Sequence, residues 1–171
     1  MISKSEENIV KGDCCYTMFQ TLLTNSKHET VAQFLKELIN SNHHFWQGDK
    51  YEEGMTWTFT DDNGKDAEYK NVKTFGLVDN NDIKPSDYKI IDFDILESRL
   101  TSFILKETAD NDYATKIKTL LKPYKNQRLT AYQFIPDNLE RSKFSVYSYF
   151  IALILLDKEL KKVIRIEFGQ D

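Results

Sequence analysis

The pattern of apolar and polar positions first predicts a helix at the N-terminus. Ser3 and Glu6 have the spacing of a capping box, and apolar residues follow at near-helical spacing over residues 9–23, with Gly12 as an interruption. We therefore expect the chain to begin with a helix that ends near Asn25.

A second helix is predicted over residues 31–39. Ser26 and Glu29 form another candidate capping box, and apolar residues then recur at positions i, i+3, i+4, i+7 and i+8. This spacing places all of them on one face, so it is the clearest helical pattern in the chain.

The period then changes to that of strands. Residues 55–60 alternate between large apolar side chains and threonine, and Asn63-Gly64 supplies a hairpin turn. We expect a return strand within residues 67–78, and we expect Trp57 and Phe59 to face the core.

Mixed elements follow this hairpin. Residues 89–93 have the pattern of a short strand, and Asp94 with Glu97 marks the start of a helix. A shorter helix is expected around residues 113–121, closed by Pro123.

The last third has the pattern of a sheet. Strands are expected at residues 128–135 and 144–156, although an apolar run of the latter length is also compatible with a strand that continues into a helix. Residues 163–168 alternate, with Arg165 and Glu167 on the solvent side, so the chain should end in a hairpin with one wet face.

Together these elements predict one α+β domain over residues 1–171. N-terminal helices come first, then a predominantly antiparallel sheet with further helices, and a C-terminal β-hairpin last. The 40% hydrophobic content, with only 6 Gly and 3 Pro, excludes disordered and low-complexity classes.

Composition also indicates a compartment. The adjacent Cys14 and Cys15 cannot supply a disulfide framework, so a reducing environment is the default. The N-terminus has no apolar signal region, and the longest apolar run, residues 150–156, is far shorter than the ~20 residues that span a bilayer. We expect a cytoplasmic protein without membrane contact.

Charge is concentrated in the middle of the chain. Residues 49–97 carry 13 acidic and 6 basic side chains, whereas residues 98–171 have a net charge of +4. The negative segment would repel nucleic acid and anionic lipid and attract a cationic partner or a metal ion, unless it is simply a solvated loop region.

Metal and cofactor signatures are weak. Five candidate zinc ligands lie in the N-terminal quarter, but neither C-x-x-C nor H-E-x-x-H spacing is present; they are Cys14, Cys15, His28, His43 and His44. The acidic loops beginning at Asp61 and Asp79 lack the glycine and glutamate of a calcium-binding EF-hand loop. We predict no metal and no cofactor, and a spatial Cys–His pair stays open.

Catalytic signatures are equally weak. Four acid-x-Lys pairs match the minimal pattern of a metal-dependent nuclease, but composition alone gives about three. No phosphate loop, dinucleotide fingerprint or nucleophile elbow occurs in the sequence. We therefore predict no catalytic residues, with a divergent metal-dependent hydrolase or nuclease as the alternative.

A nucleic-acid-binding module is the other alternative. A basic stretch surrounds Tyr124, and a second basic cluster lies at the last turn; the lysines and arginine are Lys116, Lys118, Lys122, Lys125, Arg128, Lys158, Lys161 and Lys162. Helix C-terminal charges and a lysine-protected hairpin explain the same residues without a ligand.

Aromatic side chains interleave with acidic ones in the middle segment. Such a mixture supplies anchors and electrostatic steering toward a basic protein surface. The predicted partner-binding residues are Trp46, Asp49, Tyr51, Glu52, Glu53, Asp61, Asp62, Asp66, Glu68 and Tyr69.

In its organisation the chain resembles the immunity proteins of bacterial polymorphic and contact-dependent growth inhibition toxins. The resemblance lies in the small, acidic α+β chain with the hairpin at residues 61–64 and the terminal hairpin within residues 145–171. It implies a cytoplasmic, non-enzymatic inhibitor that covers the active site or substrate groove of a cognate toxin, often a basic nuclease. It assigns no individual residue a role.

Overall fold

The computed structural model describes residues 1–45, 52–60, 63–125, 127–137, 139–140 and 149–170, apart from the side chains of Phe59 and Gln170. Within these residues the chain forms a six-stranded antiparallel sheet in the order β1-β2-β10-β9-β8-β7. Its strands are β1 (Ile2–Gly12), β2 (Cys15–Thr24), β7 (Tyr88–Ile91), β8 (Leu129–Phe134), β9 (Tyr149–Asp157) and β10 (Lys162–Gln170). The expected α+β class, the antiparallel sheet and the C-terminal hairpin are confirmed.

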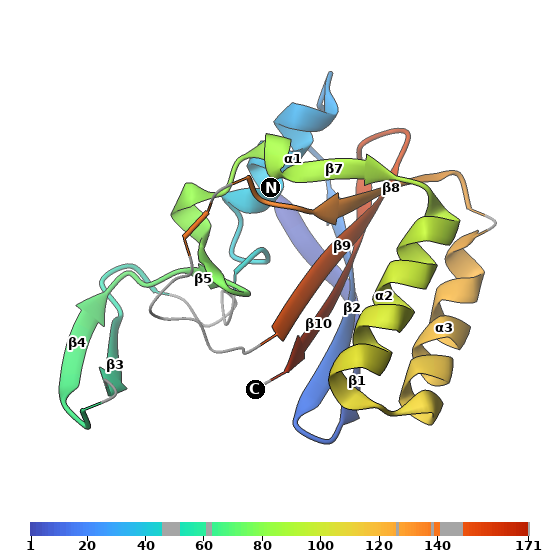
Figure 1. The fold of residues 1–171 in the computed structure, drawn as a ribbon. Helices are drawn as coiled ribbons and strands as arrows, with labels where there is room; N and C mark the ends of the chain where they lie inside the picture. Colours follow the sequence, from blue (N-terminus) through green and yellow to red (C-terminus); the bar gives the residue numbers. More distant parts are fainter. Residues whose placement is uncertain (46–51, 61–62, 126, 138, 141–148, 171) are drawn as a thin grey trace.

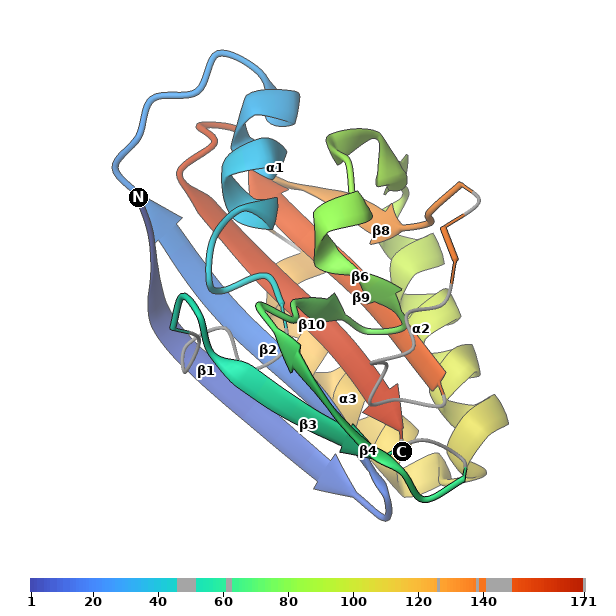
Figure 2. The ribbon, with the colours of Figure 1, turned by 90° about the vertical axis from the view of Figure 1, so that its left-hand side faces the viewer.

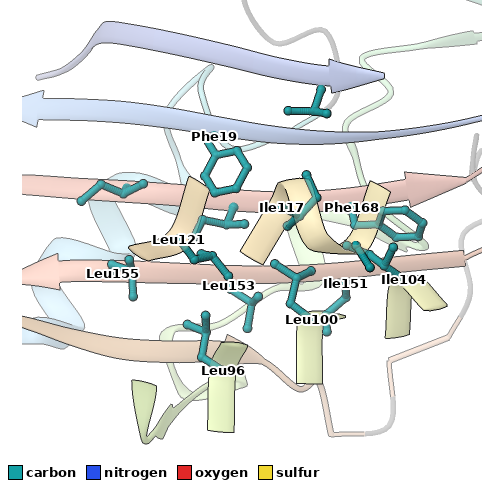
Figure 3. Packing of buried hydrophobic residues seen from close by; sticks show 14 of the residues in the cluster. Phe19, Leu96, Leu100, Ile104, Ile117, Leu121, Ile151, Leu153, Leu155 and Phe168 are labelled. Atoms are coloured by element: carbon teal, nitrogen blue, oxygen red, sulfur yellow. The ribbon is translucent and has the colours of Figure 1, made fainter. Parts of the chain in front are cut away.

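Two helices cover one face of this sheet (Figure 1). Helix α2 (Phe93–Thr108) is capped by Asp92, and helix α3 (Asn111–Lys125) begins where the Asp110 carboxylate accepts the Tyr113 amide proton at 2.8 Å. Figure 3 shows their apolar side chains facing those of the strands. The core of this layer includes Phe19, Leu96, Leu100, Ile104, Ile117, Leu121, Leu153, Ile166 and Phe168.

Shorter elements cover the opposite face (Figure 2). They are α1 (Val31–Ile39), the small hairpin of β5 (Thr74–Phe75) and β6 (Val78–Asp79), and the single turns η2 (Asn80–Asp82) and η3 (Pro85–Asp87). This second core includes Leu22, Phe34, Leu38, Phe75, Ile154, Leu156 and Val163. Because both faces are covered, β9 and β10 are buried on both sides, which explains their nearly continuous apolar run.

The N-terminal helix predicted up to Asn25 is wrong, because this region forms the hairpin β1–β2. Strand β2 lies between β1 and β10 and buries residues on both faces, so its apolar positions mimic helical spacing. Gly12 and Cys15 pair at the end of the hairpin, and Cys14 occupies the turn with φ of 53°. Gly12, which looked like an interruption of a helix, is therefore the end of a strand.

The other helices are confirmed, with different boundaries. Helix α1 begins with a capping box of Thr30 and Gln33, rather than at Ser26. Pro123 does not close α3, because it lies inside the last turn and the helix continues to Lys125. The predicted order, with helices mostly ahead of the sheet, is wrong, since α1 follows two strands and α2 and α3 lie between β7 and β8.

The prediction that one face of the terminal hairpin is exposed to solvent is also wrong. Arg165 and Glu167 are only 4% and 6% exposed, because α1 and the β5–β6 hairpin cover the sheet face that they occupy. The strands expected near residues 89–93 and 128–135 are confirmed as β7 and β8. Of the expected strand at 144–156, residues 149–156 belong to β9, and residues 144–148 lie outside the described residues.

Candidate functional site

The predicted central hairpin is confirmed and forms a separate two-stranded sheet. Strands β3 (Thr56–Thr60) and β4 (Asp66–Lys70) pair with each other in antiparallel register. Figure 1 shows this hairpin, labelled β3 and β4, standing away from the main sheet and its helices. Those of its side chains that the structure describes belong to neither hydrophobic core.

Hydrogen bonds define the base of this hairpin. The Gly54 amide donates to the Asn71 side chain at 2.8 Å, and the Asn71 amide donates to the Met55 carbonyl at 3.1 Å. Gly54 and Asn71 both have positive φ, a conformation that glycine and asparagine adopt readily. The chain therefore turns sharply on both sides of the hairpin, which sets it apart from the body.

The two faces of the hairpin differ in chemistry. Trp57 lies opposite Tyr69, and both are half-buried. On the other face, Thr58 lies opposite Glu68 and Thr60 opposite Asp66, with Lys70 opposite Thr56 at the base of the hairpin, and all of these are exposed. Alternation along the strands thus produces one aromatic face and one acidic, hydroxyl-rich face. Trp57 is half-buried and is not among the described residues of either core, so the expectation that it faces a main core is not confirmed, and the Phe59 side chain lies outside the described residues.

The predicted partner-binding residues divide into two groups. Glu52, Glu53, Asp66 and Glu68 are exposed on or beside the hairpin, where Tyr69 lies on the aromatic face. The other five lie outside the described residues: Trp46, Asp49, Tyr51, Asp61 and Asp62. The structure thus brings the five described residues of the predicted surface into one region.

The basic residues predicted as a nucleic-acid surface are partly neutralised. Lys125 forms an ion pair with Asp94 at 2.6 Å, and Lys118 pairs with Glu97 at 3.3 Å. Both pairs link α3 to α2, so these lysines contribute to helix packing. The ion pairs thus give Lys118 and Lys125 a structural role.

A second group of polar side chains is fully buried between the sheet and the layer of α1. His44 donates through Nδ1 to Asn80 Oδ1 at 2.5 Å and accepts at Nε2 from the Tyr88 hydroxyl at 2.7 Å. The Asn80 amide nitrogen donates to the Ile39 carbonyl at 3.0 Å, so its oxygen must face His44. Because an amide oxygen only accepts, the His44 proton lies on Nδ1.

Arg165 connects this histidine to the sheet. Its guanidinium donates to the Gln20 side chain and to the His44 carbonyl, each at 3.0 Å, and it also pairs with Glu167. Gln20 in turn donates to Glu7 on the edge strand β1 at 2.9 Å. This network, which we call the buried polar cluster, ties β1, β2, β10 and β7 to the segment that follows α1.

Burial determines the charge states in this cluster. Burial, with the nearby Arg165 charge, lowers the pKa of His44 to about 3, so the imidazole is neutral at pH 7. Burial also raises the pKa of Tyr88, which keeps its hydroxyl as a donor. Burial raises the pKa of Glu167, while the adjacent Arg165 opposes that shift. Except for Glu7 on the edge strand, the residues of the cluster are at most 6% exposed, so the cluster holds the layers of the molecule together.

The residues considered for zinc are dispersed. His28 pairs with Glu37 at 2.5 Å, and Cys14 is exposed at the β1–β2 turn. Among the described residues, no group of three or more His, Cys, Asp or Glu side chains could hold a metal ion. A pair of Cys15 with His44 is excluded because these residues lie on opposite faces of the sheet.

Comparison with known proteins identifies no relative: no family model, no curated protein and no solved structure matches this chain. In the part of the chain that the structure describes, the helices are too short or too polar to cross a bilayer.

Proposed function

We propose that this chain is a non-enzymatic inhibitor of the immunity-protein type, which binds a cationic protein through the projecting β3–β4 hairpin. The observation that carries the proposal is the position of the hairpin, which belongs to neither core and exposes its acidic face. Residues 52–70 contain six acidic residues and two lysines. An element that contributes little to the core, yet carries oriented charge and aromatic side chains, suits partner recognition.

The partner is identified by a pull-down with the tagged full chain from the source cell. Beads are washed at low and high salt, and the retained proteins are identified by mass spectrometry. We expect one stoichiometric basic protein whose retention weakens with salt, because screening reduces attraction between exposed charges.

The surface is then tested by charge reversal. Changing Glu52, Glu53, Asp66 and Glu68 to Lys should slow association with the captured partner by at least about tenfold at low salt. The control variant changes four exposed acids elsewhere to Lys, and they are Glu29, Asp112, Glu140 and Glu159. Both variants have the same net charge, so an equal effect of the two would show that the hairpin is not the contact surface.

A further inference from the structure

An apolar cavity lies where strands β8 and β9 part. The β8–β9 ladder ends at the pair Gln133–Leu153, and β8 then stays with β7, where Phe134 pairs with Tyr88. Strand β9 continues to Tyr149 alongside β10. The notch between the two strands contains a cavity of about 350 Å³, which is within the range of small-molecule sites.

The walls of this cavity come from both layers of the molecule. Phe103 of α2 and Ile151 of β9 belong to the helix-covered side, and Phe134, Phe150 and Ala152 belong to the opposite side. The described lining side chains are apolar except for Gln133. An occupant therefore needs an apolar body.

Arg99 orients the side chain of Gln133, the polar residue that lines this cavity. Its guanidinium donates to Gln133 Oε1 at 2.6 Å, and Arg99 precedes Phe103 by one helical turn. Because a guanidinium only donates, the atom facing it is the amide oxygen, and the amide nitrogen of Gln133 remains as a donor. Arg99 is exposed and forms no ion pair with another described residue, so its positive charge is also available.

We propose that this cavity binds a small apolar carboxylate. The apolar body would occupy the notch between β8 and β9, and the carboxylate would accept hydrogen bonds from the Gln133 amide and the Arg99 guanidinium. Hydrogen bonds from charged donors to carboxylates are about twice as strong as neutral ones, which favours the acid over a neutral analogue. This site is independent of the β3–β4 hairpin and of its partner.

The test compares octanoate with octanol, which share the alkyl chain and differ in charge. Isothermal titration calorimetry of the full chain should show octanoate binding about tenfold more tightly than octanol. Arg99→Leu should remove this preference while leaving octanol binding unchanged. Lys116→Leu, which removes one exposed positive charge on α3, should retain the preference of the parent chain.

A second pair of variants tests the cavity itself. Ala152→Leu should fill the notch and weaken the binding of both probes, and Leu139→Trp at the half-buried rim does the same if Ala152→Leu fails to fold. Absence of saturable binding in the parent chain would overturn the proposal. Retention of the octanoate preference in Arg99→Leu, or unchanged binding after the notch is filled, would overturn it as well.

Discussion

The main sheet and the β3–β4 hairpin are built from the same kind of strand, but their surroundings differ. Strands β9 and β10 have helices on one face and α1 with β5–β6 on the other, so their side chains are buried almost without interruption. The hairpin is a separate two-stranded sheet, and its described side chains are at most half-buried. A strand therefore contributes to the core where both of its faces are covered, and it forms a surface where they are not.

The burial of a strand therefore cannot be inferred from the polarity of its residues alone. Arg165 and Glu167 are charged but buried in the sheet. Strand β3, in contrast, alternates apolar residues such as Trp57 with threonine, and its described side chains lie outside both cores. Mutations in the two regions should consequently differ in what they change. Substitutions in the sheet should lower stability, and substitutions in the hairpin should alter association.

The largest effect is expected from breaking the buried ion pair. Arg165→Met leaves the Glu167 carboxylate buried without its partner and should lower the free energy of unfolding by about 3–5 kcal/mol. Urea denaturation followed by circular dichroism measures this loss. The double variant Arg165→Met with Glu167→Leu removes both charges, so it should recover part of the stability. A double variant no more stable than the single one would contradict this interpretation.

Creating a void in the helix-covered core should lower the free energy of unfolding by slightly less. Leu153 is fully buried in the centre of β9, and Leu153→Ala should cost about 3 kcal/mol through lost contacts and the remaining void. The matched hairpin variant is Thr58→Ala, which should change the unfolding free energy by less than about 0.5 kcal/mol. Similar losses in the two variants would remove the distinction between core and surface strand.

His44 should make stability sensitive to acid. Its folded pKa of about 3 lies below the unfolded value of 6.5, so the unfolded state binds the extra proton as the pH falls between these values. The stabilising contribution of neutral His44 is complete above pH 6.5 and is lost toward pH 3, at about 1.4 kcal/mol per pH unit.

A substitution at His44 separates its effect on stability from the effects of the other titrating groups of the cluster. The raised pKa of Glu167 acts in the opposite direction, because the unfolded carboxyl ionises first as the pH rises. His44→Gln retains hydrogen-bonding groups but does not titrate, so the difference between its stability profile and that of the parent isolates His44. A parallel pair of profiles between pH 6.5 and 4 would show that His44 does not cause the acid sensitivity.

The sequence predicted elements well where one face is wet or the period is regular. The stripe over residues 31–39 and the alternation leading to Asn63-Gly64 both gave the observed type of element. The pattern failed for β2, because a strand buried on both faces has no polar side to reveal its period. It failed at Arg165 because pattern reasoning assigns charged residues to solvent, and here Gln20 and the His44 carbonyl provide hydrogen bonds inside.

The candidate surface was predictable only in part. Charge and aromatic residues pointed to the segment around Glu68, but they did not show that the hairpin would stand apart from the cores. The buried polar cluster was not predicted, because His44, Asn80 and Tyr88 come from separate parts of the chain. The notch beside Gln133 depends on where two strands separate, which no local pattern specifies.

The smallest stability effect is expected in the hairpin, where the effect on binding should be largest. Glu68→Lys replaces an exposed side chain opposite Thr58, so the unfolding free energy should change by less than about 0.5 kcal/mol. Association with the captured basic partner should nevertheless slow at low salt and approach the parent rate at high salt, because the lost attraction is long-range and screened. Stopped-flow mixing measures both rates, with Glu159→Lys at the β9–β10 turn as the control of equal net charge. If a stable Glu68→Lys variant associated at the parent rate, the hairpin would have no role in recognising the partner.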